Sequence, residues 1–402
     1  MVAALIFLSP TSASDDWPQW RGPHRNGISD EKGWSVQWPA DGPKQLWKLF
    51  IGGGYSSVAV VGGRLYTAGN YKDVDTIWCL DAESCKTVWK YSYPCPYGGW
   101  GGTRATPTIE GKSLYSMSRT GQVFCLDAET GKLNWSTEAA KEMGAKPPTW
   151  DFASSPLVEG GLLILNIGGA GVALDKATGK VAWKSTPEQC GYASAVACDL
   201  AGGQRCVLIF SAKGLAGVDP RDGRRILWYP WESYDNINAA DPIVDAETAF
   251  ISSGYKKGGA LLRLETPTPK VIWQNQNMCN HFASCVLVDG HLYGSDGNVE
   301  KDGVLSCVEL KTGQLKWTKK GTGMVSVIVA DGKLIGITEQ GDLIIAEATP
   351  KEYHELARAK VLTGKCWTPP VLSGGRIYCR NHEGTLACID VRPAPAAQPP
   401  GR

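Results

Sequence analysis

Side chains able to bind and orient a ligand are concentrated in a few short segments of this 402-residue chain. These segments combine aromatic rings with a guanidinium, two carboxylates, an amide and an imidazole. Aromatic faces stack on a sugar or another flat ring, and polar groups fix its orientation. We therefore expect a ligand site built from nine residues, namely Trp100, Arg104, Trp150, Asp151, Tyr234, Asp235, Asn238, His281 and Trp367.

The chemistry of these residues leaves binding and catalysis both open. Arg104 suits a carboxylate or a phosphate, because a guanidinium pairs with both oxygens of such a group. A carbohydrate-active hydrolase or lyase would use His281, Tyr234 or Asp235 as acid or base, with Arg104 neutralising a uronate. A lone histidine in a loop is more often a hydrogen-bonded structural residue, and the aromatics would equally serve to pack loops around a channel. We assign no catalytic residue.

An internal repeat of 38 to 48 residues predicts the elements that position these side chains. In five units a Trp follows the acidic marker by eight positions, and in a sixth unit it follows by nine. This pattern is typical of a β-hairpin in which the acidic side chain caps the turn and the Trp packs on the adjoining sheet. Eight markers indicate eight units; they are Asp81, Asp127, Asp175, Asp219, Glu265, Glu309, Glu347 and Asp390.

The two ends of the repeat region predict how the units close into a ring. The last unit ends after Asp390 without a fourth strand, whereas Trp47 has no acidic turn before it. The strand around Trp47 can therefore complete the last unit and remove its open edge. We predict an all-β fold, an eight-bladed β-propeller of four-stranded antiparallel blades closed by the N-terminal strand. The connections between blades meet at one mouth of such a ring, which would gather the nine residues.

The rest of the chain suggests an exported protein. We expect a signal peptide at residues 1–14, a lead-in segment at 15–44, the propeller at 45–391 and a Pro-rich disordered tail at 392–402. Apolar runs are too short to span a bilayer. The formal net charge of +1 shows no excess of basic residues of the kind that binds nucleic acid. We predict a periplasmic or secreted monomer without a transmembrane segment.

The 13 cysteines do not define a disulfide framework. Cys79, Cys125, Cys307 and Cys388 occupy the same place in different units, so we expect them to be separate, buried and small. Bridges between sequence neighbours stay open at this point, and the candidates are Cys85 with Cys95, Cys190 with Cys198 or Cys206, and Cys279 with Cys285.

The segment from Ala128 to Trp135 resembles the tryptophan-docking repeat of the pyrroloquinoline-quinone-like, or quinoprotein alcohol dehydrogenase-like, propeller family. The segment from Trp17 to Gly27 is similar to a lead-in of exported members with no assigned activity. The resemblance implies either a binding propeller of the cell envelope, with a carbohydrate or an envelope protein as partner, or a quinone-dependent oxidoreductase. Enzymes of this family hold calcium through Glu, Asn and Asp and place two adjacent cysteines beneath the quinone. This chain has no adjacent cysteines, so we predict that it uses no cofactor, neither pyrroloquinoline quinone nor calcium, and that it has no metal site.

Overall fold

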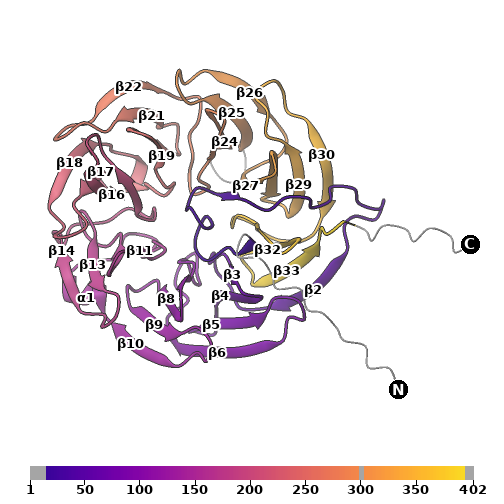
Figure 1. The fold of residues 1–402 in the computed structure, drawn as a ribbon, viewed down its shortest axis with the longest axis horizontal. Coiled ribbons are helices and arrows are strands. Elements are labelled where there is room, and N and C mark those ends of the chain that lie inside the picture. Colours follow the sequence, from indigo (N-terminus) through magenta and orange to yellow (C-terminus); the bar gives the residue numbers. More distant parts are fainter. Residues whose placement is uncertain (1–14, 298–302, 394–402) are drawn as a thin grey trace, which may run out of the picture.

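The computed structural model describes residues 15–297 and 303–393, which form eight β-sheets arranged as blades around a central axis (Figure 1). The expected signal peptide and most of the expected tail lie outside the described residues. Six blades are built from four consecutive strands in simple antiparallel order. The prediction of an eight-bladed β-propeller is confirmed.

The first four blades come from residues 59–230. Their strands are β3 (Ala59–Val61), β4 (Arg64–Tyr71), β5 (Val74–Asp81) and β6 (Thr87–Pro94); β7 (Thr108–Glu110), β8 (Ser113–Met117), β9 (Val123–Asp127) and β10 (Leu133–Thr137); β11 (Leu157–Glu159), β12 (Leu162–Leu165), β13 (Val172–Asp175) and β14 (Val181–Lys184); β15 (Val196–Asp199), β16 (Arg205–Ser211), β17 (Gly214–Val218) and β18 (Arg225–Pro230). The short helix α1 (Ala139–Met143) follows β10.

The other four blades complete the ring. Their strands are β19 (Ile243–Asp245), β20 (Thr248–Ser253), β21 (Gly258–Arg263) and β22 (Lys270–Asn275); β23 (Val286–Val288), β24 (His291–Asp296), β25 (Val304–Glu309) and β26 (Leu315–Lys319); β27 (Val325–Ala330), β28 (Lys333–Thr338), β29 (Asp342–Glu347) and β30 (Glu355–Lys360), joined by β1 (Ile28–Ser29); β31 (Val371–Ser373), β32 (Arg376–Arg380) and β33 (Thr385–Asp390), joined by β2 (Gln45–Phe50). The 3-10 turn η2 (Tyr234–Asn236) lies between β18 and β19.

The tryptophans of the repeat dock most blades onto the next one. The indole N–H of Trp89 donates to the carbonyl of Ala128 at 2.9 Å, and this contact recurs on four further blades. Gly131 in the acceptor turn has a φ of 73°, and a Cβ there would lie 2.6 Å from the Trp89 ring. The turn therefore needs glycine both for its left-handed backbone and for the close approach of the indole. The recurring contacts are Trp135 with Lys176, Trp183 with Pro220, Trp273 with Leu310 and Trp317 with Thr349.

The N-terminal strand closes the ring, as predicted. Strand β2 pairs antiparallel with β33, with Trp47 opposite Cys388. The Trp47 indole donates to the carbonyl of Ala82 at 3.3 Å, which repeats the docking contact across the closure. Because β2 and β33 come from opposite ends of the described chain, this pairing joins the first blade to the last and leaves the ring without an open edge at this point.

The lead-in is part of the folded structure. Trp17 forms a β-bridge with Val60, and β1 pairs in parallel with β27. In Figure 1 this indigo segment crosses the middle of the ring before the chain turns outward to β2. Residues that precede the propeller strands in sequence therefore pass through the middle of the ring.

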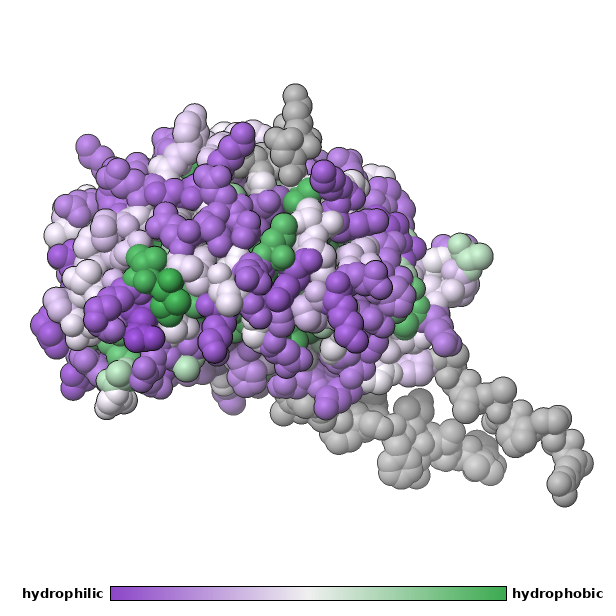
Figure 2. All heavy atoms as spheres, turned by 90° about the horizontal axis from the view of Figure 1, so that it is seen from above, coloured by the Kyte–Doolittle hydropathy of each residue, from purple (hydrophilic) through white to green (hydrophobic). Residues whose placement is uncertain are grey.

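Apolar side chains are buried between the blades, whereas the outer wall seen in Figure 2 is mostly hydrophilic with a few separate hydrophobic patches. All 13 cysteines have free thiols, so none of the local disulfides left open above is formed. The four repeat cysteines are buried in separate blades, as expected. Within the described residues, no helix is long and apolar enough to cross a membrane.

We predict that removing residues 1–50 produces an aggregating protein, because the loss of β2 leaves β33 with an unpaired edge. A chain that begins at Lys44 keeps β2 and should aggregate less. Light scattering and thermal melting of the two truncated proteins make the comparison. Equal melting and equal scattering would show that β2 does not close the ring.

Candidate functional site

A cavity of about 240 Å³ opens where the connections between blades meet. Five of the nine predicted residues line it, namely Trp100, Arg104, Trp150, His281 and Trp367. They lie in four different connections, each of which joins the outer strand of one blade to the inner strand of the next. The topology of the ring brings these separate segments together.

Trp367 is the centre of an aromatic wall. Its ring stacks on Trp100 with 5.7 Å between ring centres and on Tyr55 with 5.8 Å, and Phe282 packs against it at 4.7 Å. The Trp367 indole donates to Glu339 Oε1 at 2.9 Å. The Lys365 ammonium lies 4.5 Å from the Trp367 ring and 4.7 Å from the Trp100 ring. These contacts hold four aromatic rings in a defined orientation, suitable for stacking on a flat ligand.

Arg104 is a largely buried cation beside this wall. Its guanidinium lies 5.3 Å from the Tyr55 ring centre and donates to the carbonyl of Trp100 at 2.7 Å. Its Nε has no hydrogen-bond partner, and the described residues form no ion pair with it. Burial lowers the pKa of Arg104 from its ordinary value. The site therefore contains positive charge that is not neutralised by direct contact with a carboxylate.

Two further polar groups in the cavity lack partners. The Tyr55 hydroxyl accepts and donates no hydrogen bond within the described chain, and burial raises its pKa to about 12. Both ring nitrogens of His281 are also without partners, and burial lowers its pKa to about 4. His281 is therefore neutral at physiological pH, with one nitrogen able to donate and the other able to accept.

Asp151 lies outside the cavity lining. Its carboxylate accepts a hydrogen bond from Arg119 Nε at 2.7 Å and also contacts the Arg119 Nη2. The Arg119 side chain is only 3% exposed, so this carboxylate neutralises a buried cation.

The other three predicted residues also lie outside the lining. Tyr234 and Asp235 lie on η2 and are exposed, with Tyr234 packing on the Tyr255 ring at 4.7 Å. Asn238 is fully buried; it donates to the carbonyl of Ser211 at 2.8 Å and accepts from the Ser253 hydroxyl at 2.7 Å. These contacts stabilise the connection that passes beside the cavity.

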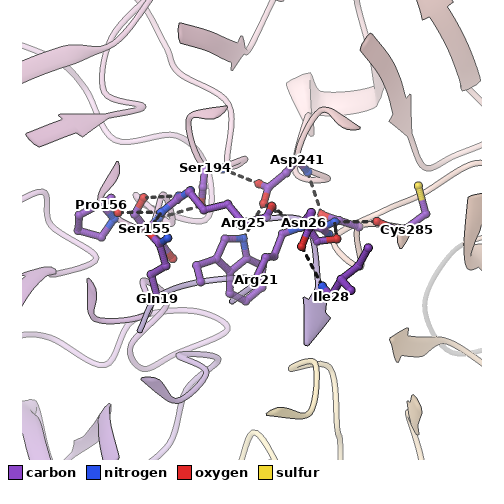
Figure 3. Close-up of polar contacts among 12 residues, drawn as sticks. Gln19, Arg21, Arg25, Asn26, Ile28, Ser155, Pro156, Ser194, Asp241 and Cys285 are labelled. Atoms are coloured by element: carbon purple, nitrogen blue, oxygen red, sulfur yellow. Dashed lines mark hydrogen bonds and ion pairs between the residues drawn. The ribbon is translucent and has the colours of Figure 1, made fainter. Parts of the chain in front are cut away.

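The floor of the cavity contains residues that the sequence analysis missed. Trp20 and Asp241 line it together, and the Trp20 indole donates to Asp241 Oδ2 at 2.6 Å. Trp20 belongs to the lead-in, whose residues Arg21 and Arg25 lie close to Asp241 (Figure 3). Two signals were present in the sequence: the Trp- and Arg-rich segment from Trp17 to Gly27, and Asp241-Pro242 at the place where other repeats have Thr106-Pro107 or Ser155-Pro156.

The acidic side chains near this site already have partners within the chain, which does not favour a calcium ion here. Among the described residues, no three His, Cys, Asp or Glu side chains are close enough to hold a metal ion. Two nearby carboxylates pair with cations, Asp151 with Arg119 and Asp241 with Arg21, and a third, Glu339, accepts from the Trp367 indole. The expectation that the chain uses neither quinone nor calcium stays a prediction, which an absorption spectrum of the isolated protein tests.

The family model described as outer membrane protein assembly factor BamB (PQQ_2) matches residues 96–319, more than half of the chain. The chain belongs to this PQQ-like propeller family. It is 23% identical over 375 residues to the outer membrane protein assembly factor BamB of Moranella endobia, covering 79% of this chain and 90% of that protein.

Dehydrogenases of the same superfamily are also similar. The polyvinylalcohol dehydrogenase of a Sphingopyxis species is 30% identical over 206 residues, which is 44% of this chain and 29% of that protein. The crystal structure of the quinohemoprotein alcohol dehydrogenase of Comamonas testosteroni superposes with a TM-score of 0.72 at 15% identity, over 98% of this chain and 83% of that one. At this identity the likeness shows the fold alone.

We predict that His281 makes stability depend on pH. Unfolding restores its ordinary pKa of 6.5, whereas the folded pKa is about 4. Below about pH 6.5 the unfolded chain binds a proton that the folded chain does not bind, so the folded state loses stability until about pH 4. The wild type should therefore lose about 2 kcal/mol of unfolding free energy between about pH 8 and about pH 5 through this residue, and His281→Gln should not show this loss. Denaturant titrations measure this difference, and a constant difference at all pH values would contradict the burial of a neutral imidazole.

Proposed function

We propose that this chain is an exported ligand-binding propeller of the cell envelope, and that its mouth cavity binds a uronic acid, a sugar ring that carries a carboxylate. The observation that carries the proposal is that three residues with buried, partnerless polar groups all line one aromatic cavity. These groups are Arg104 Nε, the Tyr55 hydroxyl and the two ring nitrogens of His281. Buried polar atoms normally have partners, and a bound ligand would supply them.

The charge around the cavity favours an acid over a neutral sugar. Asp151 is in direct contact with Arg119, and Asp241 with Trp20 and Arg21. Arg104 has no such carboxylate within the described chain. A ligand carboxylate would therefore neutralise Arg104 in a largely dry site, where the pairing is stronger than at an exposed surface.

The aromatic wall and the neutral donors suit the rest of a sugar. Apolar C–H faces of a pyranose ring would stack on Trp367 or Trp150, while Tyr55 and His281 would bond its hydroxyls. Among the described residues that line the cavity, Asp241 is the one carboxylate. Hydrolysis of a glycosidic bond generally uses two carboxyl groups. Binding without turnover is therefore the function we propose for this cavity.

The envelope location rests on the family description, which names an outer membrane assembly factor, and on the predicted signal peptide. An envelope protein is a second candidate partner. Tyr71, Trp100 and Tyr234 lie at the mouth end of the ring and are 57%, 48% and 65% exposed. Exposed aromatic side chains at one end of a ring are typical of contact surfaces between proteins.

Calorimetric titration with galacturonate tests the proposed ligand. Arg104→Met, Trp367→Ala and His281→Ala should each weaken binding by about 1–3 kcal/mol, because each removes a buried contact. Galactose, which lacks the carboxylate, should bind more weakly than galacturonate to the wild type and should respond less to Arg104→Met. Arg225→Met is the matched control, since Arg225 also lies over an aromatic ring, that of Trp228, but is not among the residues that line the cavity.

Three results would overturn the proposal. The first is undiminished galacturonate binding in all three cavity variants. The second is equal binding of galactose and galacturonate, which would remove the role of Arg104. The third is tight binding of benzoate with no binding of galacturonate, which would keep the cavity and the charge but replace the sugar by a flat aromatic acid.

A further inference from the structure

Eight equivalent positions surround the central channel, one at the start of the inner strand of each blade. Seven of these positions carry a hydroxyl, and the eighth carries a carboxylate. The positions are Ser57, Thr106, Ser155, Ser194, Asp241, Ser284, Ser326 and Thr368.

From Ser57 to Ser284, hydrogen bonds to side chains link six of these positions, each blade to the next. The Ser57 amide donates to the Thr106 hydroxyl at 2.9 Å, and the Thr106 amide donates to the Ser155 hydroxyl at 3.0 Å. The Ser155 amide continues the series to Ser194 at 3.0 Å. A hydroxyl is sufficient for this link, since each amide needs one acceptor oxygen.

Asp241 performs the same link with one oxygen and has a second oxygen left over. Its Oδ1 accepts from the Ser194 amide at 2.7 Å, and its own amide donates to the Ser284 hydroxyl at 2.9 Å. Its Oδ2 accepts from the Trp20 indole at 2.6 Å and lies 3.9 Å from Arg21 Nε. The carboxylate therefore adds to the ring link a charged contact with the lead-in.

The lead-in brings two arginines to this point (Figure 3). Arg21 Nη2 donates to the carbonyls of Cys285 at 2.8 Å and Asn26 at 3.0 Å. Arg25 Nη1 donates to the carbonyl of Pro156 at 3.0 Å and to Gln19 Oε1 at 3.1 Å. The segment from Trp17 to Gly27 thus contacts blades on opposite sides of the channel through buried polar groups.

The buried charges stabilise one another. Burial raises the pKa of Asp241 and lowers that of Arg21, while the attraction between the two groups opposes both shifts. A carboxylate alone in this channel, or an arginine alone, would be a buried and uncompensated charge, which is strongly destabilising. A hydroxyl at position 241 would complete the ring of links but would leave Arg21 and Arg25 without a nearby anion.

We propose that the channel beneath the cavity is a binding site for the chain's own Trp17–Gly27 segment, and that Asp241 is the residue that selects this segment through Trp20 and the arginines. The segment then completes the floor of the mouth cavity with the Trp20 ring. This inference concerns the chain alone and holds whether or not the cavity binds a uronic acid.

Asp241→Ser tests the proposal in the full-length protein, because it installs the hydroxyl found at the other seven positions and removes only the charge. Trypsin cleaves after Arg21 or Arg25 only when the segment leaves the channel. We expect cleavage at these two sites, mapped by mass spectrometry, to be about a hundredfold faster than in the wild type, since one partner of a buried ion pair is missing. Asp241→Asn, which keeps the shape of the side chain, should show the same increase.

Ser284→Ala is the control, because it removes a ring link next to Asp241 and leaves every charge in place. It should leave cleavage after Arg21 and Arg25 close to the wild-type rate. Unchanged cleavage in Asp241→Ser and Asp241→Asn would overturn the proposal, as would an equal increase in Ser284→Ala. Arg21→Met removes the other partner and should speed cleavage after Arg25, which keeps the test valid if position 241 tolerates no change.

The galacturonate titration separates this inference from the proposed ligand. If both proposals hold, Asp241→Ser releases the segment and also weakens galacturonate binding, because the Trp20 floor is lost. Release of the segment without any galacturonate binding in the wild type would leave the channel site standing and would overturn the ligand alone.

Discussion

A four-stranded sheet with apolar residues on both faces buries them only when a neighbouring sheet covers each face, so blades of this kind are stable in a closed ring. The docking tryptophans are examples of this dependence, because each one contacts the neighbouring blade. Trp89 lies on the glycine turn of the following blade, and Trp47 repeats the contact across the closure. Pairing of β2 with β33 is therefore the constraint on which the other features depend, because the connections between blades meet at one mouth only in a closed ring.

Closure also creates a central channel, and its filling links the N-terminal segment to the ligand cavity. Backbone groups of the inner strands face this channel, and the ring of hydroxyls satisfies part of them. The Trp17–Gly27 segment supplies Arg21 and Arg25 below the cavity, while Arg104 lies beside it. Asp241 compensates Arg21 and Arg25, whereas Arg104 has no carboxylate partner among the described residues. A carboxylate on a small ring is the ligand that Arg104 and the aromatic wall would recognise together.

The sequence was sufficient for the blades and for part of the candidate site. Acidic turns and tryptophans lie within one hairpin, so their spacing is a local signal that predicts the blades and the closing strand. Trp100, Trp150 and Trp367 were predicted to meet because topology alone brings the connections together. Asp151 and Asn238 were predicted in the site by residue type, but tertiary contacts decide where they lie. Asp151 accepts a hydrogen bond from the buried Arg119, and Asn238 donates one to the carbonyl of Ser211. The partners that hold the lead-in in the channel, Pro156, Asp241 and Cys285, lie more than a hundred residues away along the chain, so its place there could not be predicted from spacing.

The most direct test of the central claim, that a charged aromatic cavity above a closed channel binds a small acid, is to identify the molecule that copurifies with the protein from its native host. Denaturing the wild-type protein and analysing the released small molecules by mass spectrometry should give a uronic acid in about equimolar amount, and the same procedure should give none from Arg104→Met. Release of a neutral sugar, of pyrroloquinoline quinone, or of equal amounts of the same compound from both proteins would contradict this account.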